Sequence, residues 1–237
     1  MKTLKIGLCV ADRGEYVPIA EAMEELGALR KDFFSRKGHI YTLEKGNVNI
    51  ELYSVLSGIG MVNAAAASMY LVNLGCEIII NTGYSGGISG VKAGQVVVGT
   101  KFIEHDFDLT GIGYKEFEKP EQEYVYGADT SLSKAALSVF EGSKECVMLS
   151  GDRFVSSSAD KERFTKMFDS AVCCDMETAA VAYVCALSGT KYLSVRLVSD
   201  TAGDDSAGEY MESLSSNITN GFADIVLKTL DIIASEV

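Results

Sequence analysis

The sequence lacks the features that mark a membrane or exported protein. No segment of its 237 residues approaches the roughly 18 consecutive apolar residues of a membrane-spanning helix. The first residues, Met1-Lys-Thr-Leu-Lys-Ile-Gly7, lead directly into a strand-like run and show no signal-peptide pattern. We therefore expect a cytoplasmic protein that does not enter a membrane.

Basic residues are also few. Lysine and arginine number 21 against 33 acidic residues, which gives a formal net charge of -12. Nucleic acids and anionic membrane surfaces are recognised by basic patches, so this balance argues against both as partners. It also disfavours a polyanionic substrate, unless one pocket gathers local positive charge.

Histidine is scarce, with two residues, and the six cysteines include no C-x-x-C pair. A metal site needs a cluster of such ligands, so the sequence predicts no metal and no cofactor. The cysteines lie among apolar residues, where we expect reduced, buried thiols. They are Cys9, Cys76, Cys146, Cys173, Cys174 and Cys185.

Nothing in the sequence divides the chain. It has two prolines, no internal repeat and no Pro- or Ser-rich linker, while 47% of its residues are hydrophobic. A chain of this length and composition can bury one substantial core. We therefore expect residues 1–237 to form a single domain.

What is present is an alternation of strand-like and helix-like segments. The predicted strands are Leu4–Val10, Ile50–Leu56, Cys76–Thr82, Gln95–Ile103, Glu145–Leu149 and Lys191–Ser199. The predicted helices are Glu15–Leu29, Met61–Leu74, Ser131–Phe140, Ala159–Phe168, Met176–Leu187 and Ala207–Ala234. Because the strands are continuously apolar, the pattern predicts an α/β fold of three layers, α/β/α, around a mixed, largely parallel sheet.

One connection is unusually long. Residues 104–127 are polar and aromatic and lack a helical period. A connection of this length in a compact domain is usually functional or interfacial, although an ordinary surface excursion fits the sequence equally well.

Two glycine-containing segments follow predicted strands. Ser57-Gly-Ile-Gly60 opens a helix, where small residues let backbone amides approach a ligand, although a plain tight turn explains it equally well. Asn81-Thr-Gly-Tyr-Ser-Gly-Gly87 predicts a backbone turn close to another group. Neither segment fits a dinucleotide fingerprint or a P-loop, because the spacing and the P-loop lysine are missing.

Three carboxylates stand near the ends of predicted strands. Arg196-Leu-Val-Ser-Asp200 reads as a buried strand that ends in an acid, and Glu15 follows the first strand. Glu177 is expected in the first turn of a helix, where helix-start stabilisation alone would explain it. If the strands are parallel, the three acids meet at one edge and suit cleavage of a sugar bond, in which one acid protonates the leaving group and another activates water. Crowding would raise one pKa and keep that acid protonated near neutrality.

Taken together, the motifs resemble those of 5′-methylthioadenosine/S-adenosylhomocysteine nucleosidases of the purine nucleoside phosphorylase superfamily. The resemblance covers nearly the whole chain. In order, the motifs are Lys5-Ile-Gly7 with Glu15, Ser57-Gly-Ile-Gly60, Asn81-Thr-Gly-x-x-Gly-Gly87, His105-Asp-x-Asp-x-Thr110 with Gly113-Tyr114, Ser150-Gly-Asp-x-Phe154, Met176-Glu177 and Arg196-x-x-Ser-Asp200.

The resemblance implies a purine nucleoside phosphorylase-like fold and a reaction. The N-glycosidic bond of 5′-thio-substituted adenosines would be hydrolysed to adenine and a thioribose, a step of nucleoside catabolism and methionine salvage. Asp200 would protonate N7 of the departing adenine, and Glu15 would take a proton from the attacking water.

The resemblance also implies how the nucleoside is bound. Phe154 would stack on adenine and the Val155 backbone would pair with its edge. Met176 and Glu177 would hold the ribose hydroxyls, for which a carboxylate is suited because both of its oxygens accept hydrogen bonds. Arg196 would orient the carboxylates and the water. The remaining implied binding residues are Ser57, Ile59, Gly83, Tyr84, Asp175, Ser199 and Tyr210.

Two alternatives stay open. A phosphorylase would share the leaving-group chemistry but needs cations for phosphate. Hexameric bacterial-type phosphorylases carry Arg at the position of Asn81, and Glu15 would repel an anion, so hydrolysis is favoured.

The nucleosidases carry Ser where this chain has Tyr84 and Phe where it has Ile112. A nucleosidase for another nucleoside, such as the futalosine type, is therefore the second alternative, and Tyr84 would fill part of the water site or bond to the sugar.

Finally, the resemblance implies a homodimer in which the long connection reaches the neighbouring subunit. Leu109, Ile112, Tyr114 and Pro120 would line the partner's 5′-alkylthio pocket, and Tyr210 would close it from the same chain. Apolar residues around a thioether would favour methylthio or homocysteinyl groups over a bare hydroxyl.

Overall fold

The structure, a computed structural model, describes residues 2–33, 38–215 and 221–236. The strands in these ranges are β1 (Lys2–Val10), β2 (Leu29–Phe33), β3 (Gly38–Lys45), β4 (Val48–Leu56), β5 (Ile78–Ser89), β6 (Val96–Glu104), β7 (Val125–Gly127), β8 (Lys144–Ser150), β9 (Val172–Asp175) and β10 (Lys191–Asp200). The helices are α1 (Arg13–Glu25), α2 (Met61–Asn73), α3 (Thr130–Val139), α4 (Ser158–Met167), α5 (Thr178–Ser188), α6 (Ser206–Ser215), α7 (Gly221–Ser235) and the short 3-10 helix η2 (Thr110–Ile112).

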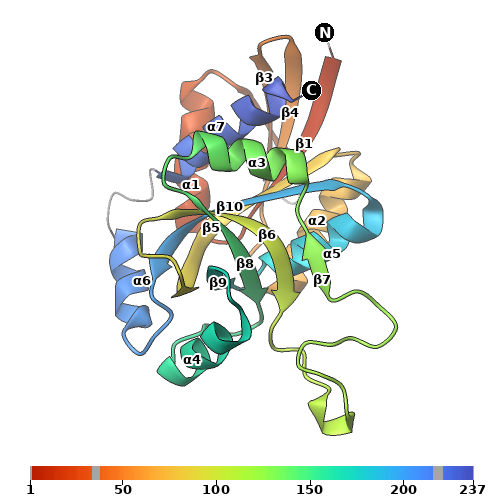
Figure 1. Ribbon diagram of the computed structural model, residues 1–237. Coiled ribbons are helices and arrows are strands. Elements are labelled where there is room, and N and C mark those ends of the chain that lie inside the picture. Colours follow the sequence, from red (N-terminus) through yellow and green to blue (C-terminus); the bar gives the residue numbers. More distant parts are fainter. Residues whose placement is uncertain (1, 34–37, 216–220, 237) are drawn as a thin grey trace.

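The strands form one mixed sheet (Figure 1), in the order β10-β6-β8-β9-β5-β1-β4-β3-β2, with β7 paired to β6. β10 also pairs with β5, so β5, β10, β6, β8 and β9 close into a ring of paired strands. The strands β4, β1, β5 and β10 run parallel, which brings their carboxyl ends to the same edge. The predicted mixed α/β fold is confirmed.

Helices cover both faces of the sheet (Figure 1). On one face, α1, α3 and α7 pack onto the strands through a core that includes Ile19, Leu132 and Phe222. On the other face, α2 and α5 pack against each other and the sheet through Leu71 and Val181. In addition, α4 contacts β5 and α6 contacts β10, so these two helices lie beside the strands that carry the predicted site.

The predicted elements were wrong at several places. β2, β3, β7 and β9 were missed, because β2 is a polar edge strand, β3 has mixed burial, and β7 and β9 are short. The predicted helix 207–234 is two helices, α6 and α7, and its residues 216–220 lie outside the described ranges. The turn predicted for Asn81–Gly87 does not exist, since β5 runs through it to Ser89.

The long connection contains little regular structure among its described residues. Between β6 and β7, η2 is the one short helix, and the segment extends away from the body of the molecule (Figure 1). Within the described part of the chain, no helix combines the length and apolar character needed to cross a membrane.

Candidate active site

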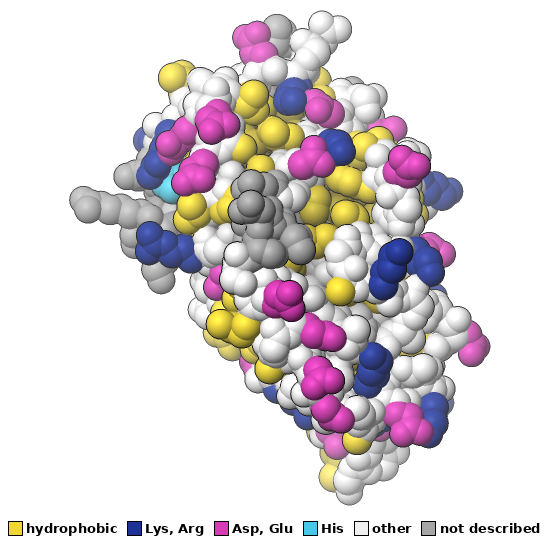
Figure 2. Space-filling view, turned by 90° about the vertical axis from the view of Figure 1, so that its left-hand side faces the viewer, with side chains coloured by type: hydrophobic (Ala, Val, Ile, Leu, Met, Phe, Trp, Pro, Cys, Tyr) yellow, Lys and Arg dark blue, Asp and Glu magenta, His cyan; other side chains and the backbone are white. Residues whose placement is uncertain are grey.

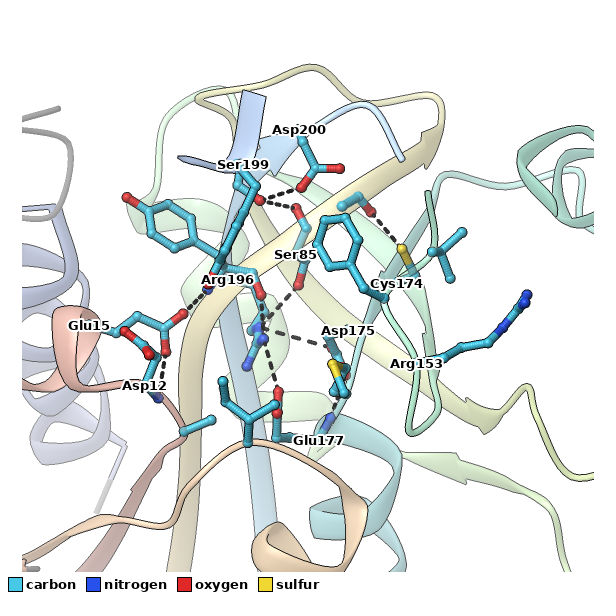
Figure 3. Close-up of a pocket in the computed structure, with 18 residues that line it drawn as sticks. Asp12, Glu15, Ser85, Arg153, Cys174, Asp175, Glu177, Arg196, Ser199 and Asp200 are labelled. Atoms are coloured by element: carbon cyan, nitrogen blue, oxygen red, sulfur yellow. Dashed lines mark hydrogen bonds and ion pairs between the residues drawn. The ribbon is translucent and has the colours of Figure 1, made fainter. Parts of the chain in front are cut away.

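A pocket lies at the carboxyl ends of the parallel strands. Most residues predicted to bind substrate line it, namely Glu15, Ile59, Tyr84, Phe154, Val155, Asp175, Met176, Glu177, Arg196, Ser199, Asp200 and Tyr210. Figure 3 shows Arg196 at the centre of the pocket, with Glu15 to one side, Asp200 and Ser199 above it, and Asp175 and Glu177 below. The three acids singled out in the sequence therefore converge. Glu15 follows β1 and Asp200 ends β10, both of which run parallel to β5, whereas Glu177 follows β9, which runs antiparallel to β5.

Asp200 is the last residue of β10 and is almost completely buried. Its Oδ2 accepts a hydrogen bond from Ser199 Oγ at 2.6 Å, and its Oδ1 accepts one from the Ala202 amide at 2.8 Å. Burial raises the pKa of Asp200 above its ordinary value, although these two hydrogen bonds oppose the shift. The site therefore favours a protonated acid at this position more than water does.

Glu15 lies in the first turn of α1, where Asp12 is the N-cap. Its Oε2 accepts the Asp12 amide at 3.4 Å and completes a capping box, while its Oε1 accepts the Tyr84 amide at 2.7 Å. Glu15 is nevertheless 4% exposed. Burial raises its pKa to about 7, against the opposing charge of Arg196. A carboxylate with this pKa can gain and lose a proton near neutrality.

Arg196 is buried, and its guanidinium is bonded inside the protein. Nε donates to Ser85 Oγ at 3.0 Å, Nη1 donates to Asn81 Oδ1 at 2.9 Å, and Nη2 donates to the Tyr84 carbonyl. Its charge is balanced by Glu177, whose Oε2 lies 3.6 Å from Nη2. This arrangement holds the carboxylates in place and leaves the guanidinium poorly disposed to bind an added anion.

The helix start at α5 is built differently from the prediction. Glu177 is the N-cap residue and its side chain does not cap the helix. Asp175 takes that role, because its Oδ1 accepts the amides of Glu177 and Thr178, each at 2.9 Å, and the Ser150 hydroxyl at 2.7 Å. The Glu177 carboxylate is thereby turned into the pocket, where burial raises its pKa.

The segment Ser57–Gly60 offers fewer free amides than its sequence suggested. The Gly60 amide donates to Glu177 Oε1 at 3.0 Å, and the Met61 amide donates to Asp152 Oδ1 at 2.7 Å. Ser57 Oγ donates to the Val10 carbonyl at 3.2 Å. The start of α2 therefore positions Glu177 through its backbone, and Ser57 is not part of the pocket lining.

Aromatic residues form the mouth of the pocket. The Phe154 side chain is 44% exposed, and its ring centroid lies 5.7 Å from that of Tyr210 on α6. The Tyr84 ring packs edge-on against Phe222 at 4.7 Å, and its hydroxyl donates to the Ser213 carbonyl at 3.0 Å. The Tyr84 hydroxyl is therefore bonded to α6. This disfavours both roles expected for Tyr84, which were to fill part of the water site or to hydrogen-bond to the sugar.

The remaining predicted residues lie outside this pocket. Gly83 does not line it, but the glycine is required, because a Cβ there would stand 2.7 Å from Glu15 Oε2. The four residues assigned to a partner's pocket also lie elsewhere, on the long connection, where Ile112 is 73% exposed. They are Leu109, Ile112, Tyr114 and Pro120.

Sequence reasoning missed several lining residues, which are Ala11, Asp12, Ser85, Gly86, Arg153 and Cys174. Ser85 and Gly86 lie within the glycine-containing segment 81–87, and Arg153 lies within the motif 150–154. Their place inside motifs already singled out could have indicated them. Cys174 carried no such signal, because its apolar surroundings indicated an ordinary core thiol. No group of three or more metal-ligating side chains occurs within residues 2–33, 38–215 and 221–236.

Comparison with known proteins identifies the family of the chain. A family model described as the Phosphorylase superfamily matches residues 5–230. A 5′-methylthioadenosine/S-adenosylhomocysteine nucleosidase of Exiguobacterium is 32% identical over 218 residues, which cover 85% of this chain and 93% of that protein.

Solved structures share the whole fold. The nucleosidase of the same name from Neisseria meningitidis, in complex with methylthio-immucillin-A, is 31% identical, covers 100% of both chains and has a TM-score of 0.81. The Helicobacter pylori nucleosidase with butyl-thio-DADMe-Immucillin-A is 25% identical, with 97% of this chain and 98% of that one covered and a TM-score of 0.86.

Proposed function

The chain belongs to the phosphorylase superfamily, and we propose that within it the protein is a hydrolase that cleaves the N-glycosidic bond of 5′-methylthioadenosine and S-adenosylhomocysteine. The observation that carries this choice is the state of Arg196. Three of its donors are bonded to Asn81, Ser85 and the Tyr84 backbone, and Glu177 balances its charge. Phosphate requires available cationic donors, whereas water requires a base.

The second arginine of the described pocket lining does not change this conclusion. Arg153 Nη2 pairs with Asp160 Oδ1 at 2.7 Å, and its side chain is 47% exposed. Figure 3 shows it pointing away from Glu15 and Arg196. It therefore lies at the rim, while the end of the pocket beside Glu15 carries negative charge.

Asp200 is the proton donor in the proposed reaction. As the bond between C1′ of the sugar and N9 of adenine breaks, its electron pair moves into the purine, and Asp200 delivers a proton to N7. Its raised pKa and fixed orientation suit this role. The base thus leaves as neutral adenine, and the sugar develops oxocarbenium character.

Glu15 is the base in the second half. It accepts a proton from water as the water oxygen bonds to C1′, which produces the thioribose. The Tyr84 amide fixes one carboxylate oxygen, and the pKa of about 7 allows Glu15 to be ionised at neutral pH. Two carboxyl groups with separate tasks are the usual device for hydrolysing a glycosidic bond.

The other lining residues bind the substrate. Glu177 and Met176 hold the ribose hydroxyls, and the Glu177 carboxylate is fixed for this by Gly60 and Arg196. Phe154 stacks on adenine, and the Val155 backbone pairs with its edge. Ser199 supports Asp200, while Ile59 and Tyr210 close the apolar side.

We further propose that the protein is a homodimer. Leu109, Ile112, Tyr114 and Pro120 do not line the pocket of their own chain, and the segment that bears them extends away from the body (Figure 1). Placed on a neighbouring subunit, they would complete the apolar pocket for the 5′ substituent. The exposed Ile112 side chain would then be covered by the partner.

The assignment is tested by following free base from methylthioadenosine, adenosylhomocysteine, adenosine, inosine and futalosine, with and without phosphate. We expect release from the first two without phosphate. Asp200→Asn should lower turnover by about 10²–10⁴-fold or more and leave the fold intact by circular dichroism. A preference for inosine or futalosine, or near-normal turnover of the variant, would overturn the assignment.

A further inference from the structure

The residue that follows the proton donor is held by opposite charges from two helices. The Thr201 amide and hydroxyl both donate to Glu209 Oε2 of α6, at 2.7 and 3.0 Å. The Thr201 carbonyl accepts a hydrogen bond from Lys161 Nζ of α4 at 2.6 Å. The three hydrogen-bonding groups of Thr201 are therefore bound by one acid and one base.

These hydrogen bonds to Thr201 affect the orientation of Asp200. The next residue, Ala202, is fully buried and has a φ of 49°, a left-handed conformation that an alanine adopts only when its surroundings hold it. In this conformation its amide reaches back to Asp200 Oδ1 at 2.8 Å. Fixing Thr201 thus fixes the turn that orients the acid.

We propose that Glu209 and Lys161 are positioning residues that clamp Thr201 and set both the orientation and the protonation of Asp200. Neither residue lines the pocket. The inference rests on the proposed function, in which Asp200 donates a proton. It adds two residues from outside the pocket to the control of that proton.

The two charges act on Asp200 in opposite directions. The negative charge of Glu209 raises the pKa of Asp200, and the positive charge of Lys161 lowers it. Two further groups face the acid: the Ser199 hydroxyl, which bonds to it, and the Cys174 thiol of β9, whose own pKa is raised by burial so that it stays neutral. Glu209 and Lys161 therefore supply the opposing charges near Asp200.

Gly86 explains how close these groups come. A Cβ at this position would stand 3.0 Å from Asp200 Oδ1, 3.0 Å from Cys174 Sγ and 3.2 Å from Ala202 Cβ. The turn is thus packed on its inner side by β5 and β9 and held on its outer side by α4 and α6. Such packing leaves Asp200 little freedom to reorient.

The clamp can be separated from general structural support because α6 and α4 offer matched controls. Figure 2 shows acidic side chains in a row over the lower half of the face that it presents, the side of the molecule on which α6 lies in Figure 1. Glu212 on α6 and Lys166 on α4 are exposed, and Lys166 pairs with Glu162 instead of Thr201. They carry the same charges on the same helices but do not hydrogen-bond to Thr201.

The experiment measures kcat/KM for methylthioadenosine across pH in Glu209→Gln and Lys161→Met. Glutamine keeps an acceptor for Thr201 but removes the charge, so Asp200 loses its proton at lower pH. The ratio of wild-type to Glu209→Gln activity should rise with pH by about two- to fivefold, the effect of one partly screened charge. For Lys161→Met the ratio should fall with pH. Glu212→Gln and Lys166→Met should give ratios that do not change with pH.

A second measurement does not depend on activity. The carboxyl ¹³C signal of Asp200, assigned by its absence in Asp200→Asn, is titrated in the free protein, and its midpoint should move down in Glu209→Gln and up in Lys161→Met. Unmoved midpoints, or activity ratios independent of pH in both variants, would overturn the clamp. If the wild-type protein fails to hydrolyse methylthioadenosine, the proposed function falls, and the titration still decides on the clamp.

Discussion

The carboxylate of Glu15 lies against the bare Cα of Gly83. A Cβ at Gly83 would stand 2.7 Å from Oε2 and 2.9 Å from Oε1, closer than side-chain atoms approach. The backbone φ of 152° also lies at the margin of the region that favours glycine. The β5 glycine therefore makes room for the proposed base, and the amide of the next residue, Tyr84, fixes it.

Gly83→Ala should displace Glu15. A reacting group moved by a fraction of an ångström loses much of its efficiency, so we expect kcat to fall by about ten- to a hundredfold. Gly127→Ala is the matched control, because a Cβ there meets nothing within 4 Å. Steady-state kinetics and thermal unfolding of both variants check this. Wild-type turnover in a folded Gly83→Ala protein would show that a Cβ at this position does not displace the Glu15 carboxylate.

Activity should depend on the ionisation of Glu15. Only the carboxylate can accept a proton from water, so kcat/KM should decline as pH falls below about 7, the pKa to which burial raises Glu15. Glu15→Gln should bind the nucleoside but not hydrolyse it. Measurement of kcat/KM from acidic to alkaline pH, with nucleoside binding followed calorimetrically, checks both statements; hydrolysis by Glu15→Gln would reassign the base.

The raised pKa of Glu15 also makes the free energy of unfolding depend on pH. The pKa of Glu15 is 4.5 when unperturbed and about 7 in the folded protein, so the folded state binds this proton more tightly. The corresponding stability is fully present below pH 4.5 and is lost as pH rises through about 7, with an upper limit of about 3 kcal/mol. Urea unfolding at several pH values should therefore show a smaller loss of stability with rising pH in Glu15→Gln than in the wild type. Equal slopes would contradict the buried, shifted carboxyl.

Tyr84→Phe separates the side chain of this residue from its backbone. The backbone contacts to Glu15 and Arg196 persist, while the hydrogen bond to the Ser213 carbonyl is lost. We expect a loss of about 1 kcal/mol in the free energy of unfolding and a kcat close to that of the wild type. A large fall in kcat with unchanged stability would instead place the phenol hydroxyl at the water or the sugar.

Ile112→Asp tests the proposed partner pocket. A charge placed beside a thioether should raise KM for methylthioadenosine more than KM for adenosine, which lacks the apolar 5′ substituent. Val139→Asp changes another exposed apolar residue, at the end of α3, and should alter neither value. Sedimentation equilibrium of the wild type should give the mass of a dimer. A monomer, or equal effects of Ile112→Asp on both substrates, would remove this segment from the site.

Much of the site could be predicted because its chemistry sits at strand ends. Asp200 closes a continuously buried strand, and Glu15 follows the first one, so parallel pairing alone brings them together. The role of Glu177 could not be settled in this way. Two acids flank Met176, and the local pattern does not tell which one caps α5; the Ser150 hydroxyl and the Gly60 amide, distant in sequence, decide it.

The missed elements have a similar cause. Glycines at 83 and 86 indicate a turn by local preference, yet they lie in a strand because Glu15, Asp200 and Cys174 need the space that side chains would fill. That requirement arises from tertiary contacts. Likewise, β3 pairs with both β2 and β4, and its mixed burial gave no clear alternation in the sequence.

The nucleophile is the centre of the account, and its identity can be read from the sugar product. Methylthioadenosine is incubated with the protein in excess phosphate, and the products are followed by ³¹P NMR and mass spectrometry. Because three donors of Arg196 are bonded within the protein and Glu15 faces the pocket, we predict free methylthioribose and no sugar phosphate signal. Accumulation of methylthioribose 1-phosphate would contradict the account.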